Sequence, residues 1–288
     1  MHVPVLVGEV VQLLSPERGG LFVDCTVGLG GHARAVLTAG AERLIGIDRD
    51  ETALAHARVA LADFADRVEL VHADYRELTR VLDERSVARV DGILADLGVS
   101  SMQLESDGRG FSFRRDEPLD MRMDRSRGET AAELLAHVEE TELADVIYRF
   151  GEERHSRRIA RALVRARETQ PLRTTGQVAD IVRRAARVKG YSRIDPATRT
   201  FQALRIWVNR ELDGLDTFLA DGVARLHQGG RFAVITFHSL EDRIVKHTFR
   251  GLEGVKVLTK RPIAGSDAEV AENPRARSAK LRAAECVA

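Results

Sequence analysis

Four aspartates stand at the ends of short apolar runs, where they could act together on one ligand. Asp24, Asp48, Asp74 and Asp96 each lie at or beside the C-terminal end of such a run. Carboxylates bind cations, accept hydrogen bonds and can take up a proton. In an open parallel sheet the ligand binds at the carboxyl ends of the strands, so we expect these side chains to share one site. Some of them could instead cap the helices that follow, and Asp74 fits that role best.

A glycine-rich turn, GLGGHA, follows the first of these acids. Gly28, Gly30 and Ala33 fit the pattern G-x-G-x-x-G/A, and Asp48 falls 20 residues after Gly28. Both features match the dinucleotide-binding fingerprint, although the stretch could also be a plain tight turn. A diphosphate at this edge would meet several carboxylates, at a cost on the order of a kcal/mol for each close contact. S-adenosylmethionine, which carries a sulfonium and an ammonium group, suits the acids better, and an NAD-dependent oxidoreductase is the alternative.

The elements that must position these residues follow an α/β pattern. Apolar runs at 21–26, 43–48, 68–73 and 91–96 predict strands, and helical periodicity lies between them, for example over 51–64. This alternation predicts a Rossmann-like, mainly parallel sheet. The runs are apolar without alternation, which is typical of a sheet covered by helices on both faces.

The middle of the chain has a different pattern. Residues 105–216 begin with a polar, turn-rich stretch and continue with helical periodicity that contains no convincing strand. We therefore expect a discontinuous α/β domain, 1–104 and 217–288, with an inserted all-helical domain, 105–216. The basic, turn-prone tail at 271–288 is expected to lie on the surface. Later elements are predicted at 229–237 (strand), 239–250 (helix) and 255–259 (strand).

Charge is distributed unevenly along the chain. The whole sequence has 44 basic and 44 acidic residues. Residues 151–210 hold 15 Arg or Lys and 5 Asp or Glu, a net charge of +10, so the rest sums to −10. Arg154, Arg158, Arg161 and Arg165 follow a helical spacing that places them on one face. Arginine suits phosphate, so we expect this face to bind RNA, although a charged helix face is often only solvated.

Other features concern compartment and cofactors. The two cysteines, Cys25 and Cys286, are far apart and indicate neither a disulfide framework nor a metal site, which favours a reducing compartment. No apolar run approaches the roughly 20 residues of a membrane helix, and the first residues lack the features of a signal peptide. We expect a cytoplasmic protein without a membrane partner, and no cluster of metal ligands stands out.

Long motifs are distributed along nearly the whole chain. In order, they are HVPVL (2–6), DCTVGLGGH (24–32), DLGVSS (96–101), RGFSF (109–113), LDMRMD (119–124), FGEERHSRRIARA (150–162), TRTFQALRIWVN (198–209), FHSLEDRIVK (237–246) and NPRARSAKLR (273–282). Together they resemble a known family, the bacterial small-subunit ribosomal RNA methyltransferases that modify the exocyclic amino group of a cytosine. The resemblance implies a class I S-adenosylmethionine-dependent methyltransferase sheet, a helical insertion that helps to bind substrate, and a target in the decoding region of the small subunit. It favours the assembled subunit over free RNA as substrate and leaves the oligomeric state open.

The resemblance also implies roles for individual residues. Asp48 corresponds to the acid that binds the ribose, and Tyr75 takes the place of an aromatic side chain against the adenine. The remaining contacts to S-adenosylmethionine implied by the resemblance come from Gly30, Gly31, His32, Asp96 and Gln103.

Methyl transfer to an amino nitrogen needs a group that orients the amino group and receives its proton. Asp96 is the candidate, although it could also serve the cofactor alone. Methylation at carbon 5 would need a cysteine nucleophile, and neither cysteine is well placed. Phe237 and His238 could hold the cytosine, or could be a core aromatic and a structural histidine. A ribosome-assembly factor that binds RNA without catalysis is a further alternative.

Overall fold

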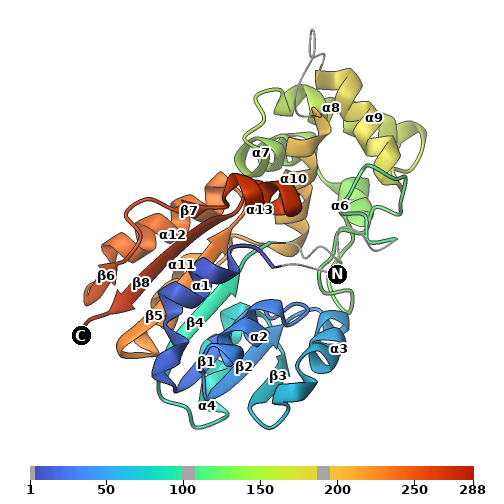
Figure 1. Cartoon of the computed structure of the whole chain (residues 1–288). Helices are drawn as coiled ribbons and strands as arrows, with labels where there is room; N and C mark the ends of the chain where they lie inside the picture. The colour runs from blue at the N-terminus through green and yellow to red at the C-terminus, as the bar shows by residue number, and fades with distance from the viewer. Residues whose placement is uncertain (1–3, 99–107, 187–194) are drawn as a thin grey trace. The chain divides into compact units, whose positions relative to one another are not determined.

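The structure is a computed structural model that describes residues 4–98, 108–186 and 195–288. Its chain divides into two compact units (Figure 1). The sheet unit combines Met1–Gly98 with Gly214–Ala288, and the helical unit consists of Val99–Asp213. Each unit has its own hydrophobic core, so the helical unit interrupts the sheet unit in sequence while packing as a body of its own.

A single sheet organises the sheet unit, with the strand order β3-β2-β1-β4-β5-β8-β6 and with β7 paired to β8. The strands from β1 to β5 run parallel to their neighbours, and β8 runs antiparallel to β5, β6 and β7. The order reverses between β1 and β4, which is the Rossmann-like arrangement, so the predicted α/β fold is confirmed. The strands are β1 (Leu21–Asp24), β2 (Arg43–Asp48), β3 (Val68–His72), β4 (Val90–Asp96), β5 (Leu226–Thr236), β6 (Val255–Val257), β7 (Ile263–Ala264) and β8 (Lys280–Cys286).

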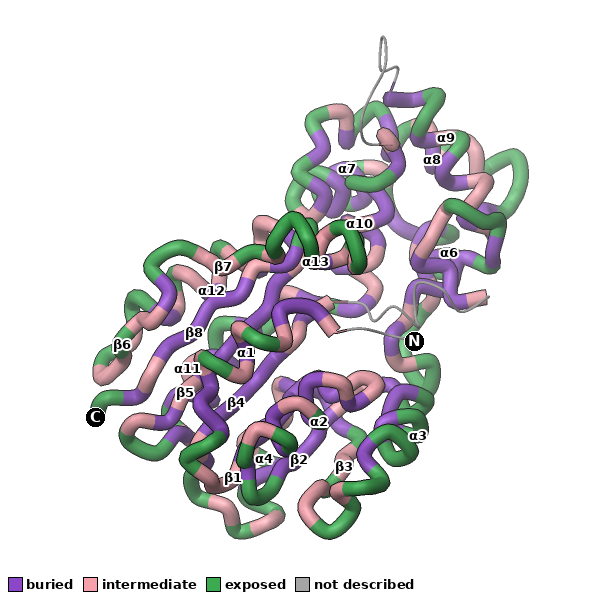
Figure 2. The backbone as a smooth tube through the Cα atoms, viewed as in Figure 1, coloured by how far each residue is buried: buried purple, intermediate pink, exposed green. Residues whose placement is uncertain are grey.

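Helices cover both faces of this sheet because alternate residues of its buried strands point to opposite sides. In β4, Ile93 and Ala95 pack with residues of α4, α11 and α12, whereas Leu94 packs with residues of α1, α2 and α3. Figure 2 shows the central strands as largely buried. The helices of this unit are α1 (Val7–Leu14), α2 (Gly31–Thr38), α3 (Glu51–Ala60), α4 (Leu78–Asp83), α11 (Leu215–Ala224), α12 (Ser239–Gly251) and α13 (Asp267–Glu272).

The C-terminal tail contains an interior strand, so the prediction that it lies on the surface was wrong. β8 is hydrogen-bonded to β5 on one side and to β6 and β7 on the other. Leu281 and Ala283 are fully buried, and Ala284 is 1% exposed. Alanine, lysine and glutamate are poor strand formers, so the segment carries little local signal. Pairing on both edges and burial between two layers decide its conformation.

The helical unit packs its helices around a separate core. The helical periodicity predicted after residue 129 corresponds to α6 (Ala131–His137), α7 (Glu140–Gly151), α8 (Ser156–Thr169), α9 (Thr175–Ala186) and α10 (Ala197–Asn209). Their apolar faces meet at residues such as Ile147, Ile159 and Leu204, all of which are at most 1% exposed. Among the residues that the structure describes, no helix is long and apolar enough to span a membrane.

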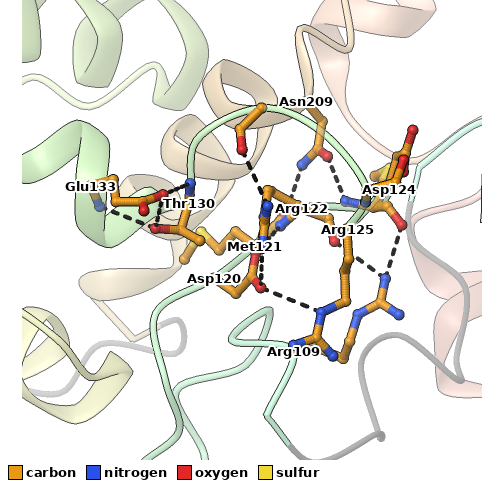
Figure 3. Close-up of polar contacts among 12 residues, drawn as sticks. Arg109, Asp120, Met121, Arg122, Asp124, Arg125, Thr130, Glu133 and Asn209 are labelled. Atoms are coloured by element: carbon orange, nitrogen blue, oxygen red, sulfur yellow. Dashed lines mark hydrogen bonds and ion pairs between the residues drawn. The ribbon is translucent and has the colours of Figure 1, made fainter.

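A polar network fixes the loop that precedes α6 (Figure 3). Asn209, at the end of α10, donates from Nδ2 to the carbonyl of Met121 (2.7 Å) and accepts the N–H of Met123 (2.8 Å). This clamp holds Met121 in a left-handed backbone conformation (φ 64°) with its side chain fully buried. Arg109, which is also buried, donates to the carbonyls of Arg122 and Met123. These hydrogen bonds therefore define the backbone conformation of the LDMRMD stretch.

Candidate active site

Three of the four aspartates end neighbouring strands at one edge of the sheet. The parallel register pairs Asp24 with Gly46 and Leu94, so β1 ends between β2 and β4. Asp48 and Asp96 are the last residues of those two strands. The negative charges of Asp48 and Asp96 both act to raise the pKa of Asp24, which is the electrostatic consequence of this arrangement.

Asp74 has a structural role at the same edge. It caps the short 3-10 helix Tyr75–Glu77, where its side chain accepts the N–H of Arg76. It also forms ion pairs with Arg76 (2.7 Å) and Arg49 (3.5 Å). Although burial works to raise its pKa, the hydrogen bonds and charges of these arginines hold the pKa below its usual value. Asp74 is therefore committed to contacts within the protein.

The glycine turn connects β1 to α2 and brings backbone close to the ends of β1 and β2. Gly30 is the N-cap of α2 with a left-handed backbone (φ 84°), and a Cβ there would come 3.1 Å from Leu61 Cγ. A Cβ on Gly31 would come 2.8 Å from Pro4 Cγ. Neither position accepts a side chain without a local shift, because Leu61 and Pro4 pack directly against these two glycines.

Asp48 ties the turn to the second strand. Its Oδ2 accepts the N–H of Gly28 (2.8 Å) and its Oδ1 accepts the N–H of Asp50 (2.8 Å). Burial raises the pKa of Asp48, while these two hydrogen bonds act in the opposite direction. Each carboxylate oxygen has two lone pairs, so both can still accept a hydroxyl hydrogen. This is the capacity that a ribose-binding acid needs.

Asp24 and His32, which are buried, and Asp96, which is partly exposed, form a cluster with unused hydrogen-bonding capacity. Nε2 of His32 lies 3.6 Å from Oδ2 of Asp96. Among the described residues, no hydrogen-bond partner reaches Asp24 Oδ2, Asp96 Oδ1 or either ring nitrogen of His32. Burial raises the pKa of Asp24 to about 7. Burial works to lower the pKa of His32, but neighbouring Asp96 raises it overall. Buried polar atoms without partners in a protein interior point to a polar ligand.

Tyr75 lies in the hydrophobic core of the sheet unit. It is 8% exposed, and its ring centre lies 4.7 Å from that of Phe218. Burial raises the pKa of its hydroxyl. Most of its ring is thus covered by protein, and a contact with an adenine would use the small exposed part. Gln103, the other residue implied on this side, lies outside the described residues.

Phe237 and His238 follow β5 at the same edge and differ in their surroundings. His238 is the N-cap of α12, where its Nδ1 accepts the N–H of Glu241 (3.4 Å). Its Nε2 lies 3.2 Å from the carboxylate of Glu241. These contacts support the structural alternative for His238. Phe237 is half-buried and lies against Gly98, where a Cβ would come 3.4 Å from its ring.

The cysteines are buried and separate from each other. Cys25 is 1% exposed, and burial raises the pKa of its thiol well above the usual value. Cys286 lies in β8 and is 7% exposed. A thiol that resists ionisation is a poor nucleophile, so Cys25 is unsuited to covalent attack on a base.

The structure modifies the prediction of four arginines on one helix face. Arg154 lies in the turn before α8 and not on the helix, because α8 begins at Ser156. Arg158 donates to the carbonyl of Ala186 (2.5 Å). Sequence periodicity could place these side chains on a face but could not show where the helix starts or which backbone carbonyl an arginine meets.

The other two arginines of this set are exposed on α8. Arg161 pairs with Glu140 (3.2 Å), an exposed contact of small energetic weight. Arg165 is exposed one turn further along the helix. Both guanidiniums are accessible to a phosphate, so they are the stronger candidates for RNA binding.

Comparison with known proteins connects this site to one family. The model of the MraW methylase family matches residues 1–287. The chain belongs to this family. Relatives named ribosomal RNA small subunit methyltransferase H include those of Sorangium cellulosum, 55% identical over 99% of this chain and 91% of that protein, and of Geotalea uraniireducens, 48% identical over 99% and 98%. A solved rRNA methylase from Streptococcus thermophilus (98% and 94% covered, 11% identical, TM-score 0.43) is too distant to bear on function.

Membership of the MraW methylase family confirms the family predicted from the sequence. It favours methyl transfer over the oxidoreductase alternative, so the protein is assigned as an enzyme that uses S-adenosylmethionine. The histidine beside Asp96 had no individual signal in the sequence beyond the resemblance. A buried imidazole within reach of two carboxylates becomes visible only when β1, α2 and β4 are assembled.

Proposed function

We propose that this protein transfers a methyl group from S-adenosylmethionine to the exocyclic amino nitrogen of a cytosine in the decoding region of small-subunit ribosomal RNA. The observation that carries the proposal is the cluster of Asp24, His32 and Asp96. Its unpartnered atoms lie beside the glycine turn of a chain that belongs to the MraW methylase family.

The side chains present fit the methyl donor. Asp48 would hold the ribose hydroxyls with its remaining lone pairs, and Asp24 and Asp96 would face the cationic end. Gly30 and Gly31 would allow close approach of the backbone, and Tyr75 and Gln103 would contact the remainder. When bound, S-adenosylmethionine supplies an electrophilic methyl group on a positively charged sulfur.

Asp96 would act on the acceptor. The lone pair of the cytosine amino group is conjugated with the ring, so the amino group must be oriented before it can attack. Asp96 is 21% exposed, and among the described residues its Oδ1 has no hydrogen-bond partner. This oxygen can accept a hydrogen bond from the amino group and then its proton. Positioning and proton acceptance by one carboxylate require no covalent intermediate, which agrees with the inert Cys25.

The substrate must present an accessible base. A paired cytosine has its amino group in a hydrogen bond, so the target must be unpaired or turned out of its stack. The helical unit would contribute binding through Arg161 and Arg165. Arg154, in the turn before α8, and Arg158 would add to this binding. We infer that the physiological partner is the assembled small subunit and that binding takes place in the cytoplasm.

One experiment tests the reaction directly. The protein is incubated with labelled S-adenosylmethionine and small subunits from cells that lack the modification, and the modified base is mapped by mass spectrometry. Label on the amino nitrogen of one cytosine is the expected result. Label at carbon 5, or on another base, contradicts the proposal. The Asp96→Ala variant distinguishes enzyme from assembly factor, because a non-catalytic factor would keep its full effect on subunit assembly.

A further inference from the structure

Phe237 lies beside the acceptor end of the site. β4 and β5 pair with Asp96 opposite Ile235, and the N–H of Leu97 donates to the carbonyl of Ile235 (2.9 Å). The chain then turns at Gly98 with a left-handed backbone (φ 97°), and a Cβ there would come 3.4 Å from Cδ2 of Phe237. The ring of Phe237 therefore packs against the backbone that directly follows Asp96.

Arg275 is packed on this ring. Its guanidinium carbon lies 5.4 Å from the centre of the Phe237 ring, within the range of a cation–π contact. Arg275 belongs to the 3-10 helix η4 (Pro274–Arg277), whose first turn is capped by Asn273. Ala276 in the same turn is fully buried. η4 leads into β8, the neighbour of β5, so the fold itself fixes this arginine next to the end of β5.

The negative charges around the site indicate a role for Arg275. Negative charge on the acids of this edge, Asp24, Asp48 and Asp96, repels phosphate, so an RNA strand that delivers its base to Asp96 needs a cation close by. Arg275 is half-buried and packed on an aromatic ring, and the five N–H donors of a guanidinium can serve more than one acceptor.

We propose that Arg275 binds a backbone phosphate of the substrate RNA next to the target cytosine, and that Phe237 holds its guanidinium for this purpose. The inference rests on the proposed function and adds a contact from the sheet unit to those expected from the helical unit. The planar fork of arginine binds two phosphate oxygens at once, which a lysine at the same place does not do.

RNA affinity tests the contact without any methyl transfer. The probe is unmodified small-subunit ribosomal RNA prepared by transcription, and the dissociation constant is measured over a series of salt concentrations. Arg275→Gln is expected to weaken binding about tenfold or more. The slope of log affinity against log salt should fall by about 0.7–0.9, the value for one phosphate contact. Arg275→Lys should restore the slope but only part of the affinity.

Arg277→Gln is the matched control, since Arg277 is exposed in the same turn. It should change affinity less than twofold, a difference of about 0.4 kcal/mol. Phe237→Leu should also weaken RNA binding, because it removes the ring that holds the guanidinium of Arg275. All variants should bind S-adenosylmethionine like the wild type, as measured by calorimetry.

Several results would overturn the contact. Equal losses for Arg275→Gln and Arg277→Gln would show a general charge effect, and an unchanged salt slope for Arg275→Gln would show that it makes no phosphate contact. A loss of S-adenosylmethionine affinity with unchanged RNA affinity would assign Arg275 to the donor. The proposed function fails separately, if the wild type binds this RNA but methylates no cytosine in the subunit.

Discussion

Nε2 of His32 and Oδ2 of Asp96 lie 3.6 Å apart in a cluster where both side chains retain unused hydrogen-bonding atoms. The two residues come from different elements, α2 and β4, and His32 is 6% exposed. The imidazole is therefore held where it can stabilise a charged Asp96 and respond to its protonation.

Removing the charge of Asp96 should affect turnover more than donor binding. Asp96→Asn keeps the size of the side chain but cannot take up a proton, so kcat should fall about 10²–10⁴-fold. Single-turnover methylation measures this loss, and calorimetry measures S-adenosylmethionine binding. Asp91→Asn is a matched control at the other end of β4, where the carboxylate accepts the N–H of Leu21. Equal losses of turnover and donor affinity would assign Asp96 to the cofactor alone.

Asp24 should make stability depend on pH. Burial raises its pKa from 3.8 to about 7, so the folded protein retains a proton that the unfolded chain loses. The resulting stabilisation is fully present below pH 3.8 and is lost as the pH rises to about 7. Asp24→Asn cannot ionise, and above pH 7 it should be more stable than the wild type by an amount on the order of 4 kcal/mol.

Urea unfolding of the ligand-free protein, followed by circular dichroism at several pH values, measures this difference. The advantage of Asp24→Asn should shrink as the pH falls toward 4, because the wild-type carboxyl becomes protonated in both states. A difference that stays constant with pH would mean that Asp24 titrates near its ordinary value. His32 acts in the same direction, since its raised pKa also favours the protonated folded state.

The Asn209 clamp should stabilise the helical unit. Asn209→Ala removes donors to the carbonyls of Met121 and Arg205 and the acceptor for the Met123 N–H, so the free energy of unfolding should fall by about 1–3 kcal/mol. Fluorescence of Trp207, the only tryptophan in the sequence, reports this unit. Gln202→Ala removes a single bond from the same helix and should cost less; a larger loss for Gln202→Ala would contradict the clamp.

Charge reversal on α8 should weaken RNA binding and leave the donor site intact. Arg161→Glu combined with Arg165→Glu adds repulsion on the exposed face, so affinity for small-subunit RNA should fall steeply at low salt and converge with the wild type at high salt. Arg158→Glu should in addition destabilise the helical unit, because it removes the donor to the Ala186 carbonyl. Unchanged RNA affinity in the double variant would remove α8 from the interface.

The sequence predicts the strands correctly where the local apolar pattern agrees with burial in the folded sheet. The apolar runs that end at Asp24, Asp48 and Asp96 appear as strands because they are buried on both faces and cannot alternate. β8 was missed because alanines carry no strand signal and the pairing partners lie far away in sequence.

The residues of the site were easier to predict from the sequence than the contacts between them. The resemblance named His32 and Asp48, but only the assembled structure shows that Asp48 holds the N–H of Gly28. In the same way, the sequence left open whether His238 contacts a base or has a structural role, and its position as the N-cap of α12 depends on Glu241 one turn later. Such pairings depend on side-chain geometry, which residue spacing does not determine.

The strand order also sets the sequence of events during synthesis. β4 cannot pair with β5 until residues 226–236 have left the ribosome. β5 in turn cannot pair with β8 until residues 280–286 have been synthesised. The intervening helical unit is continuous in sequence and can acquire its core earlier. Nascent chains of this enzyme should thus contain a folded helical unit attached to an incomplete sheet. The unpaired edge of β4 is the surface that a chaperone would have to cover.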